Sequence, residues 1–196
     1  MTDPFGRSLG LSIGKPSAEI VTISHDSPHH NAAELIGGNP RVVRGPGEYE
    51  VRGVMIAGVT TPGERGSDGQ LGRNTAYAIQ IDDLVICHLG DLGRTLNAEQ
   101  VEALKDPDIL LVPVGGLCTI APAEVVEVVS QLEPKFIVPM HYAVPGVRLN
   151  LESIDRFCRE MGVQEIRPQP KLTVTPSSLP DEATVCVLEA SLARAH

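Results

Sequence analysis

Two short segments of the chain, residues 110–112 (LLV) and 136–138 (FIV), are apolar at every position. Strands buried on both faces of a sheet have this continuous pattern, whereas half-exposed strands alternate. Between them, Pro122 suits the first turn of a helix, and Val125 and Val129 continue one apolar face. Strands of this kind need a covering layer on each side. The pattern therefore predicts a layered α/β or α+β domain, with sheets inside and helices outside.

Further elements are indicated by β-branched runs between glycines and prolines. Asp82 and Asp83 separate two such runs and predict a two-residue hairpin. Helices are expected after Asn97, where Gln100 completes a capping box, after Asn150, and briefly after His30. The glycine-rich residues 63–73 are expected to form a loop. The expected strands are residues 19–24, 48–60, 75–81, 84–89, 109–113, 135–139, 171–175 and 184–189.

Composition narrows the class of protein. With three Phe, three Tyr and no Trp, the core must consist mainly of aliphatic side chains, and we expect residues 1–196 to form a single domain. A net charge of −9 without a basic stripe excludes nucleic acid as a partner, and no apolar run reaches the ~20 residues of a membrane helix. The absence of a signal-peptide pattern and of any CxxC pair favours a cytoplasmic protein with reduced thiols, with one disulfide as the alternative.

Histidines gather where strands are expected to end. His25, His29 and His30 follow one strand, and His141 follows another. A third strand end carries Asp91, three residues after His88. Imidazole and carboxylate together suit zinc, iron, manganese or cobalt. The spacing therefore indicates a metal site, although a single histidine at a strand end is more often structural.

The order of these segments resembles the metallo-β-lactamase superfamily, and within it the branch of L-ascorbate-6-phosphate lactonase-like proteins and other Zn-dependent hydrolases. The resemblance implies a four-layer αββα sandwich with a metal site between its two sheets. The first sheet would lack its N-terminal strand pair, because the chain begins just before Asp3-Pro4-Phe5. The segments that carry the resemblance are TDPF (2–5), VTISHD (21–26), GEYE (47–50), NT (74–75), HLGDLG (88–93), PVGG (113–116) and PMHY (139–142).

The family's metal ligands can be carried over only in part. His25 and His30 match the first and last histidines of the HxHxDH motif. Asp91 matches the carboxylate that can bridge two metals, and His141 matches the C-terminal histidine ligand. The aspartate of the motif, a ligand and proton acceptor in the family, is His29 here.

Other family ligands are missing. Ser27 replaces the second histidine of the motif, residues 61–63 hold no histidine, and Leu117 stands where the lactonase-like branch often has one. These departures exclude a two-metal site. They leave one divalent ion, zinc first with manganese, iron or nickel as alternatives, or no metal at all. The expected metal residues are His25, His29, His30, Asp91 and His141.

Two functions follow. The first is a metal-dependent hydrolase of a small ester, lactone or phosphorylated compound, with Asp91 and His29 as catalytic residues. The second, which the missing ligands favour, is an inactive relative that acts as a binding or structural module. His29 would serve as the base only if it does not bind the metal. Because the missing strands would expose a sheet edge, we also expect a homodimer or higher homo-oligomer.

Overall fold

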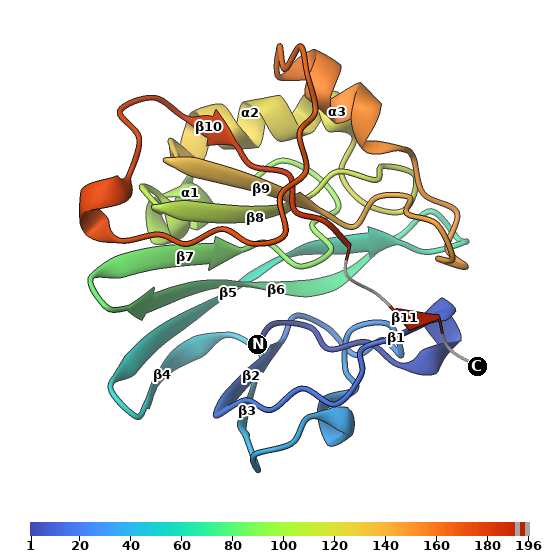
Figure 1. Cartoon of the computed structure of the whole chain (residues 1–196), viewed down its shortest axis with the longest axis vertical. Helices are drawn as coiled ribbons and strands as arrows, with labels where there is room; N and C mark the ends of the chain where they lie inside the picture. Colours follow the sequence, from blue (N-terminus) through green and yellow to red (C-terminus); the bar gives the residue numbers. More distant parts are fainter. Residues whose placement is uncertain (191–192, 195–196) are drawn as a thin grey trace.

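A seven-stranded sheet forms the centre of the computed structural model, which describes residues 1–190 and 193–194 (Figure 1). Its strand order is β10-β9-β8-β7-β6-β5-β4. Strands β7 to β10 pair in parallel, whereas β4 to β7 pair antiparallel. The strands are β4 (Gly47–Val51), β5 (Val54–Arg65), β6 (Leu71–Ile81), β7 (Leu84–His88), β8 (Ile109–Pro113), β9 (Phe136–Met140) and β10 (Thr184–Val185).

Three helices cover one face of the parallel half of this sheet (Figure 1): α1 (Ala98–Leu104), α2 (Pro122–Leu132) and α3 (Ile154–Glu160). Asn97 and Gln100 form the expected capping box at the start of α1, and Pro122 is the first residue of α2. The helices pack on a single buried cluster that contains Leu110 and Val112 of β8. On the other face of β8, Leu111 is only partly buried and lines a cavity, so the apolar run is fully buried on the helix side alone.

The other face of the large sheet meets a small parallel sheet of β2 (Ile20–Ile23) and β3 (Arg41–Arg44). Val43, Ile56 and Tyr77 fill the space between the two sheets, and the Tyr77 hydroxyl donates a 2.8 Å hydrogen bond to the Ile23 carbonyl. The first residues of the chain extend the small sheet only by an isolated bridge from Thr2 to Thr22. The remaining elements are β1 (Leu11–Ser12), β11 (Ala193–Arg194), η1 (Arg7–Leu9), η2 (Ala33–Leu35) and η3 (Pro176–Ser178).

This arrangement confirms the mixed α/β class and the hairpin between β6 and β7. Asp82 and Asp83 both have positive φ, 50° and 61°, as a two-residue hairpin of this kind requires. All four cysteine thiols are unpaired. Within residues 1–190 and 193–194, no helix is long and apolar enough to cross a membrane.

Several expected boundaries are wrong. Residues 48–60 do not form one strand, because the chain turns at Arg52-Gly53 between β4 and β5. Residues 63–73 form a loop only at 66–70, because β5 continues to Arg65 and β6 begins at Leu71, with a register irregularity between Pro62 and Arg65. Helix α3 begins at Ile154 rather than just after Asn150. Residues 171–175 form no strand, and 184–189 contribute only β10.

Candidate metal centre

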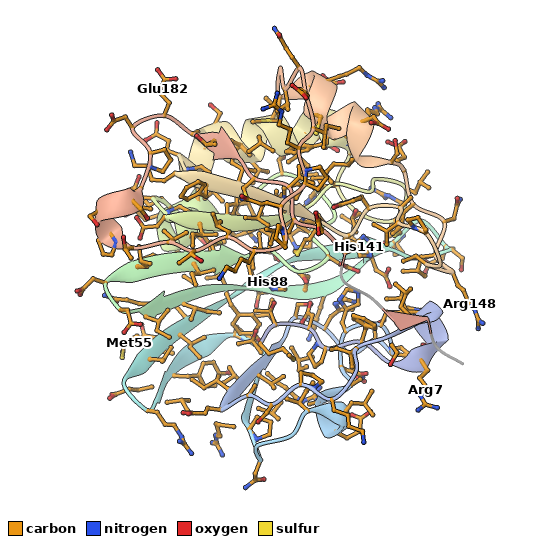
Figure 2. The ribbon with its side chains drawn as sticks, viewed as in Figure 1. Arg7, Met55, His88, His141, Arg148 and Glu182 are labelled. Carbon is orange, nitrogen blue, oxygen red and sulfur yellow. The ribbon has the colours of Figure 1, made fainter. Side chains whose placement is uncertain are left out.

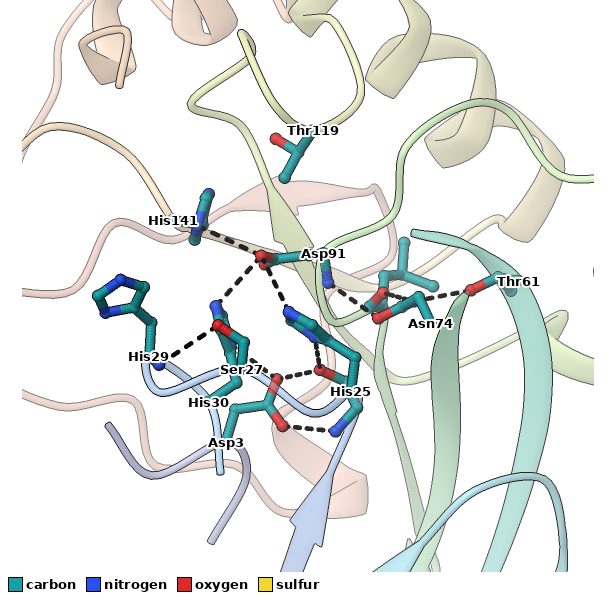
Figure 3. Close-up of polar contacts among 12 residues, drawn as sticks. Asp3, His25, Ser27, His29, His30, Thr61, Asn74, Asp91, Thr119 and His141 are labelled. Atoms are coloured by element: carbon teal, nitrogen blue, oxygen red, sulfur yellow. Dashed lines mark hydrogen bonds and ion pairs between the residues drawn. The ribbon is translucent and has the colours of Figure 1, made fainter. Parts of the chain in front are cut away.

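The polar cluster lies where strands of both sheets end, and it is built from three separate parts of the chain (Figure 3). His25 and His30 lie in the loop after β2. Asp91 follows β7, and His141 follows β9. The layered fold therefore brings together four of the five residues expected to bind metal.

Asp91 is the centre of this cluster. Its side chain is buried, and its Oδ2 atom lies 3.1 Å from His30 Nε2, 3.6 Å from His141 Nε2 and 3.8 Å from His25 Nε2. Its second oxygen, Oδ1, has no hydrogen-bond partner in the part of the chain that the structure describes, and neither has His25 Nε2. Buried polar atoms are rarely left unpaired, so this arrangement points to a group that binds among them.

A second carboxylate, Asp3, orients the two histidines of the β2 loop. Its oxygens accept from the Ser24 backbone amide at 2.7 Å and from the Ser24 hydroxyl, and Oδ2 lies 3.2 Å from His30 Nδ1. The Ser24 hydroxyl is also 3.0 Å from His25 Nδ1. Because Nδ1 of each imidazole contacts Ser24 or Asp3, the Nε2 atoms of both rings face Asp91 and are the atoms available to a metal ion.

Close backbone packing holds Asp91 and its neighbours on the side of the large sheet. Asn74 Oδ1 accepts from the Asp91 amide at 3.1 Å, while its Nδ2 donates to Thr61 Oγ1 at 2.7 Å and to the Leu89 carbonyl at 2.8 Å. Gly90 has φ of 55°, and a Cβ there would collide with Asn74 and Ser24.

His141 has φ of 53°, which is unusual for a residue with a side chain. Backbone strain of this kind concentrates at functional sites. A Cβ at Gly115 would collide with the His141 carbonyl oxygen, so the turn after β8 also depends on the absence of a side chain.

The electrostatics of the cluster shift the pKa of His30 upwards and the pKa values of His25 and His141 downwards. Burial lowers the pKa of His30, but its contacts with Asp3 and Asp91 outweigh this and raise the pKa to about 10. Burial lowers the pKa of His25 and of His141. Burial would raise the pKa of Asp91, yet the hydrogen bond with His30 and the charge of His141 bring it down to about 2. Without a metal, the cluster therefore holds a proton on His30 between two carboxylates.

The residues present fit a divalent cation. His30, Asp91 and His141 each offer one ligand atom, and these atoms lie within 4.8 Å of one another. Donors ~2.0–2.2 Å from a tetrahedral ion lie about 3.3–3.6 Å apart, close to the separations from Asp91 Oδ2. Asp3, His25 and His30 form a second such group, but there the Asp3 carboxylate is already hydrogen-bonded. The unpaired Asp91 oxygen favours the first group.

His29 lies apart from this group. Its Nδ1 atom is 3.4 Å from the Ser8 hydroxyl, and its backbone amide is 3.4 Å from the Ser27 hydroxyl. The ring nevertheless lines the same cavity as Asp91 and His30. Its assignments as ligand and as base both stay predictions, and its position outside the ligand group favours the base.

His88 also lines this cavity, at the end of β7 (Figure 2). It is buried, and its Nδ1 has no partner among the described residues. It belongs to neither group of possible metal ligands.

Sequence reasoning missed the role of Asp3, although it used the Asp3-Pro4-Phe5 segment for the resemblance. A possible signal was the carboxylate itself, directly before a proline at the beginning of the chain. Two positions where family ligands are missing have other surroundings. Thr61 accepts a hydrogen bond from Asn74, whereas the Leu117 side chain is 56% exposed to solvent.

A two-sheet fold with a His/Asp centre where its strands end defines the class of metallo-β-lactamase-like proteins. The model of the beta-lactamase superfamily domain matches residues 1–141, well over half of the chain. The chain belongs to this superfamily.

Individual relatives agree with this assignment. A UPF0173 metal-dependent hydrolase from Pyrococcus horikoshii is 35% identical over 156 residues, 78% of this chain and 66% of that protein. A solved structure from Thermotoga maritima, named as a Zn-dependent hydrolase of the metallo-beta-lactamase superfamily, is 38% identical with a TM-score of 0.76. It covers 95% of this chain and 87% of that chain. A metal-dependent hydrolase from Parabacteroides distasonis, 17% identical over 89% of this chain and 78% of its own, with a TM-score of 0.56, shares the fold alone.

Some curated relatives are considerably longer than the matching region. The chain spans 54% of the relative from Methanopyrus kandleri and 36% of the one from Caldivirga maquilingensis, both also named UPF0173 metal-dependent hydrolases.

Proposed function

We propose that the chain is a hydrolase that holds one divalent metal ion at His30, Asp91 and His141, with His25 beside them. The observation that carries this proposal is the buried Asp91 carboxylate, in which one oxygen has no hydrogen-bond partner among the described residues while the other faces three imidazoles. The metal-dependent hydrolases among the relatives support it. The metal we propose is zinc, with manganese, iron or nickel as alternatives.

The ion would supply Lewis-acid chemistry, polarising the substrate and making water a stronger nucleophile at neutral pH. The protein's own residues do the rest. Asp3 fixes the His30 ring with its Nε2 towards Asp91, and Asn74 fixes the Asp91 backbone. His29, on the cavity wall and outside the ligand group, accepts the proton of the attacking water.

One ion, rather than two, suits this site. A second would need the group of Asp3, His25 and His30, where the Asp3 carboxylate already accepts two hydrogen bonds from Ser24 and contacts His30. The His30 Nδ1 atom is likewise committed to Asp3.

A second candidate is an inactive relative that serves as a binding or structural module. Its support is the set of residues at family ligand positions that cannot bind metal, Ser27, Gly63 and Leu117. Under either candidate function we expect a homo-oligomer in a reducing cytoplasm. The molecular mass in solution tests the homo-oligomer, and the four unpaired thiols support the reducing compartment.

Elemental analysis of the protein purified without added metal separates the two candidates. The hydrolase requires close to one equivalent of a transition metal or zinc. Less than about a tenth of an equivalent, with no uptake on soaking, would remove this proposal.

Two variants then test the roles of His141 as a metal ligand and of His29 as the general base. His141→Ala should lower metal occupancy sharply. His29→Ala should keep the metal but lose at least about 100-fold in turnover, the usual contribution of a general base. Loss of metal from His29→Ala would instead make His29 a ligand.

A further inference from the structure

The Asp91 cluster lies on the wall of a cavity of about 420 Å³, within the ~300–1,000 Å³ range of small-molecule sites. The N-terminal segment, the ends of β8 and β9, and the loop after β9 form its walls. The cavity is therefore where the part of a substrate next to the scissile bond would lie.

Away from the cluster, these walls are aliphatic. The aliphatic side chains of the lining include Leu11, Leu111, Val138, Val147, Leu149 and Leu151. The Tyr142 hydroxyl, a polar group on the wall, is directed to the Leu188 carbonyl at 3.4 Å. A polar substrate group placed in this region would lose water without gaining a hydrogen bond.

The charged side chains of the cavity also disfavour an anionic group on the substrate. None of the described residues that line the cavity is a lysine or an arginine, whereas Asp3 and Asp91 are both carboxylates. Phosphate and carboxylate groups of ligands are normally bound by arginine, lysine or a helix N-terminus. Away from the Asp91 cluster, a phosphate group of a substrate would find no such partner on the described walls.

We propose that this site takes neutral esters or lactones whose non-reacting part is an apolar chain or ring, and not phosphorylated compounds. This inference rests on the proposed hydrolase function. In the reaction, the oxygen of water bonds to the acyl carbon as the acyl carbon–oxygen bond breaks. One proton of that water ends on the leaving alcohol oxygen, and a lactone keeps both products in one molecule.

The first test is a series of p-nitrophenyl esters with acetyl, butyryl, hexanoyl and octanoyl groups, with p-nitrophenyl phosphate as the anionic comparison, on the protein as purified with its metal. Each buried methylene should raise kcat/KM about fourfold, until the chain fills the cavity. p-Nitrophenyl phosphate should be turned over at least about 100-fold more slowly than the octanoyl ester, because it has no apolar chain to bury against the aliphatic walls. A flat or falling series, or a preference for the phosphate, overturns the inference.

A variant locates the effect. Val147→Arg places a cation in the aliphatic wall and should flatten the dependence on chain length. Ile81→Arg, at a 40% exposed position on the β6–β7 hairpin, is the matched control and should keep it. An equal dependence in both variants would show that the esters do not use this cavity.

A binding measurement separates this inference from the proposed function. The neutral dye N-phenyl-1-naphthylamine should fluoresce with the metal-free protein and be displaced by octan-1-ol, and Val147→Arg should weaken its binding at least about tenfold relative to Ile81→Arg. If no ester is hydrolysed but this binding pattern holds, the apolar cavity stands and the hydrolase proposal fails. If esters are hydrolysed without the chain-length dependence, the hydrolase stands and this inference fails. If neither hydrolysis nor binding occurs, both fail.

Discussion

The two halves of the candidate metal centre are held in place by different means. The half beside the small sheet, Asp3, His25 and His30, is a network of side-chain hydrogen bonds through Ser24. The half at the strand ends of the large sheet, Asp91 and His141, is held through its backbone, by local conformation and by the Asn74 side chain.

In that second half, His141 and Gly90 have positive φ, and Gly90 has no space for a side chain. The side-chain oxygen of Asn74 accepts a hydrogen bond from the Asp91 backbone amide. The difference suggests separate consequences of mutation. Changes in the network should alter how the imidazoles are aimed and hence metal affinity. Changes in the backbone packing should cost stability first.

The largest effect is expected at Gly90. Gly90→Ala forces a Cβ against Asn74 and Ser24 at a backbone with φ of 55°. Strain and overpacking together should lower the free energy of unfolding by about 4 kcal/mol. Gly53→Ala is the matched control, because Gly53 also has positive φ (80°) but open space around it. Chemical denaturation measures both, and equal losses would show that the collision is absent.

Asn74→Ala should come next. It removes three buried hydrogen bonds, each worth about 1 kcal/mol, so the loss of stability should be about 3 kcal/mol. Thr61→Val removes only the bond at Thr61 and should cost about 1 kcal/mol by the same measure. If Asn74→Ala were as mild as Thr61→Val, Asn74 would not be what holds the Asp91 backbone.

What could be predicted from the sequence is what depends on neighbouring residues, and not on contacts between distant ones. Strands β8 and β9 can be predicted because β8 and the first three residues of β9 are apolar at every position. Helix α1 can be predicted because Asn97 and Gln100, three residues apart, form a capping box. The glycine and polar residues of 63–73 predict a loop, because such residues are typical of turns. Their place in β5 and β6 depends on pairing between strands, which local composition does not encode.

At the site, the order of motifs indicated His25, His30, Asp91 and His141, all of which the fold brings together. It did not indicate Asp3, because the contacts of Asp3 with Ser24 and His30 join residues more than 20 positions apart. Nor could spacing separate His29 from His30, since adjacent residues of a loop can point in different directions.

Asp3→Asn tests the network half. The amide keeps the shape of the carboxylate but removes the charge that supports His30, so metal affinity should fall by about 10-fold or more. Stability should change much less than in Gly90→Ala. Competition with a metal chelator measures the affinity, and Asp26→Asn, an exposed aspartate of the same loop region, is the control. A large loss of stability with unchanged affinity would reverse the distinction between the two halves.

The smallest effect is expected where the two sheets are joined by charge alone. Arg52, in the turn between β4 and β5, pairs with Glu19, just before β2, at 3.1 Å, with both side chains about two-thirds exposed (67% and 70%). Water and salt screen such a pair, so a double-mutant cycle of Arg52→Ala and Glu19→Ala should give a coupling below ~0.5 kcal/mol. A coupling above about 1 kcal/mol would mean that surface charge contributes to docking the small sheet. The expected result leaves that role to the Val43–Ile56–Tyr77 cluster and to the Tyr77 hydrogen bond to Ile23.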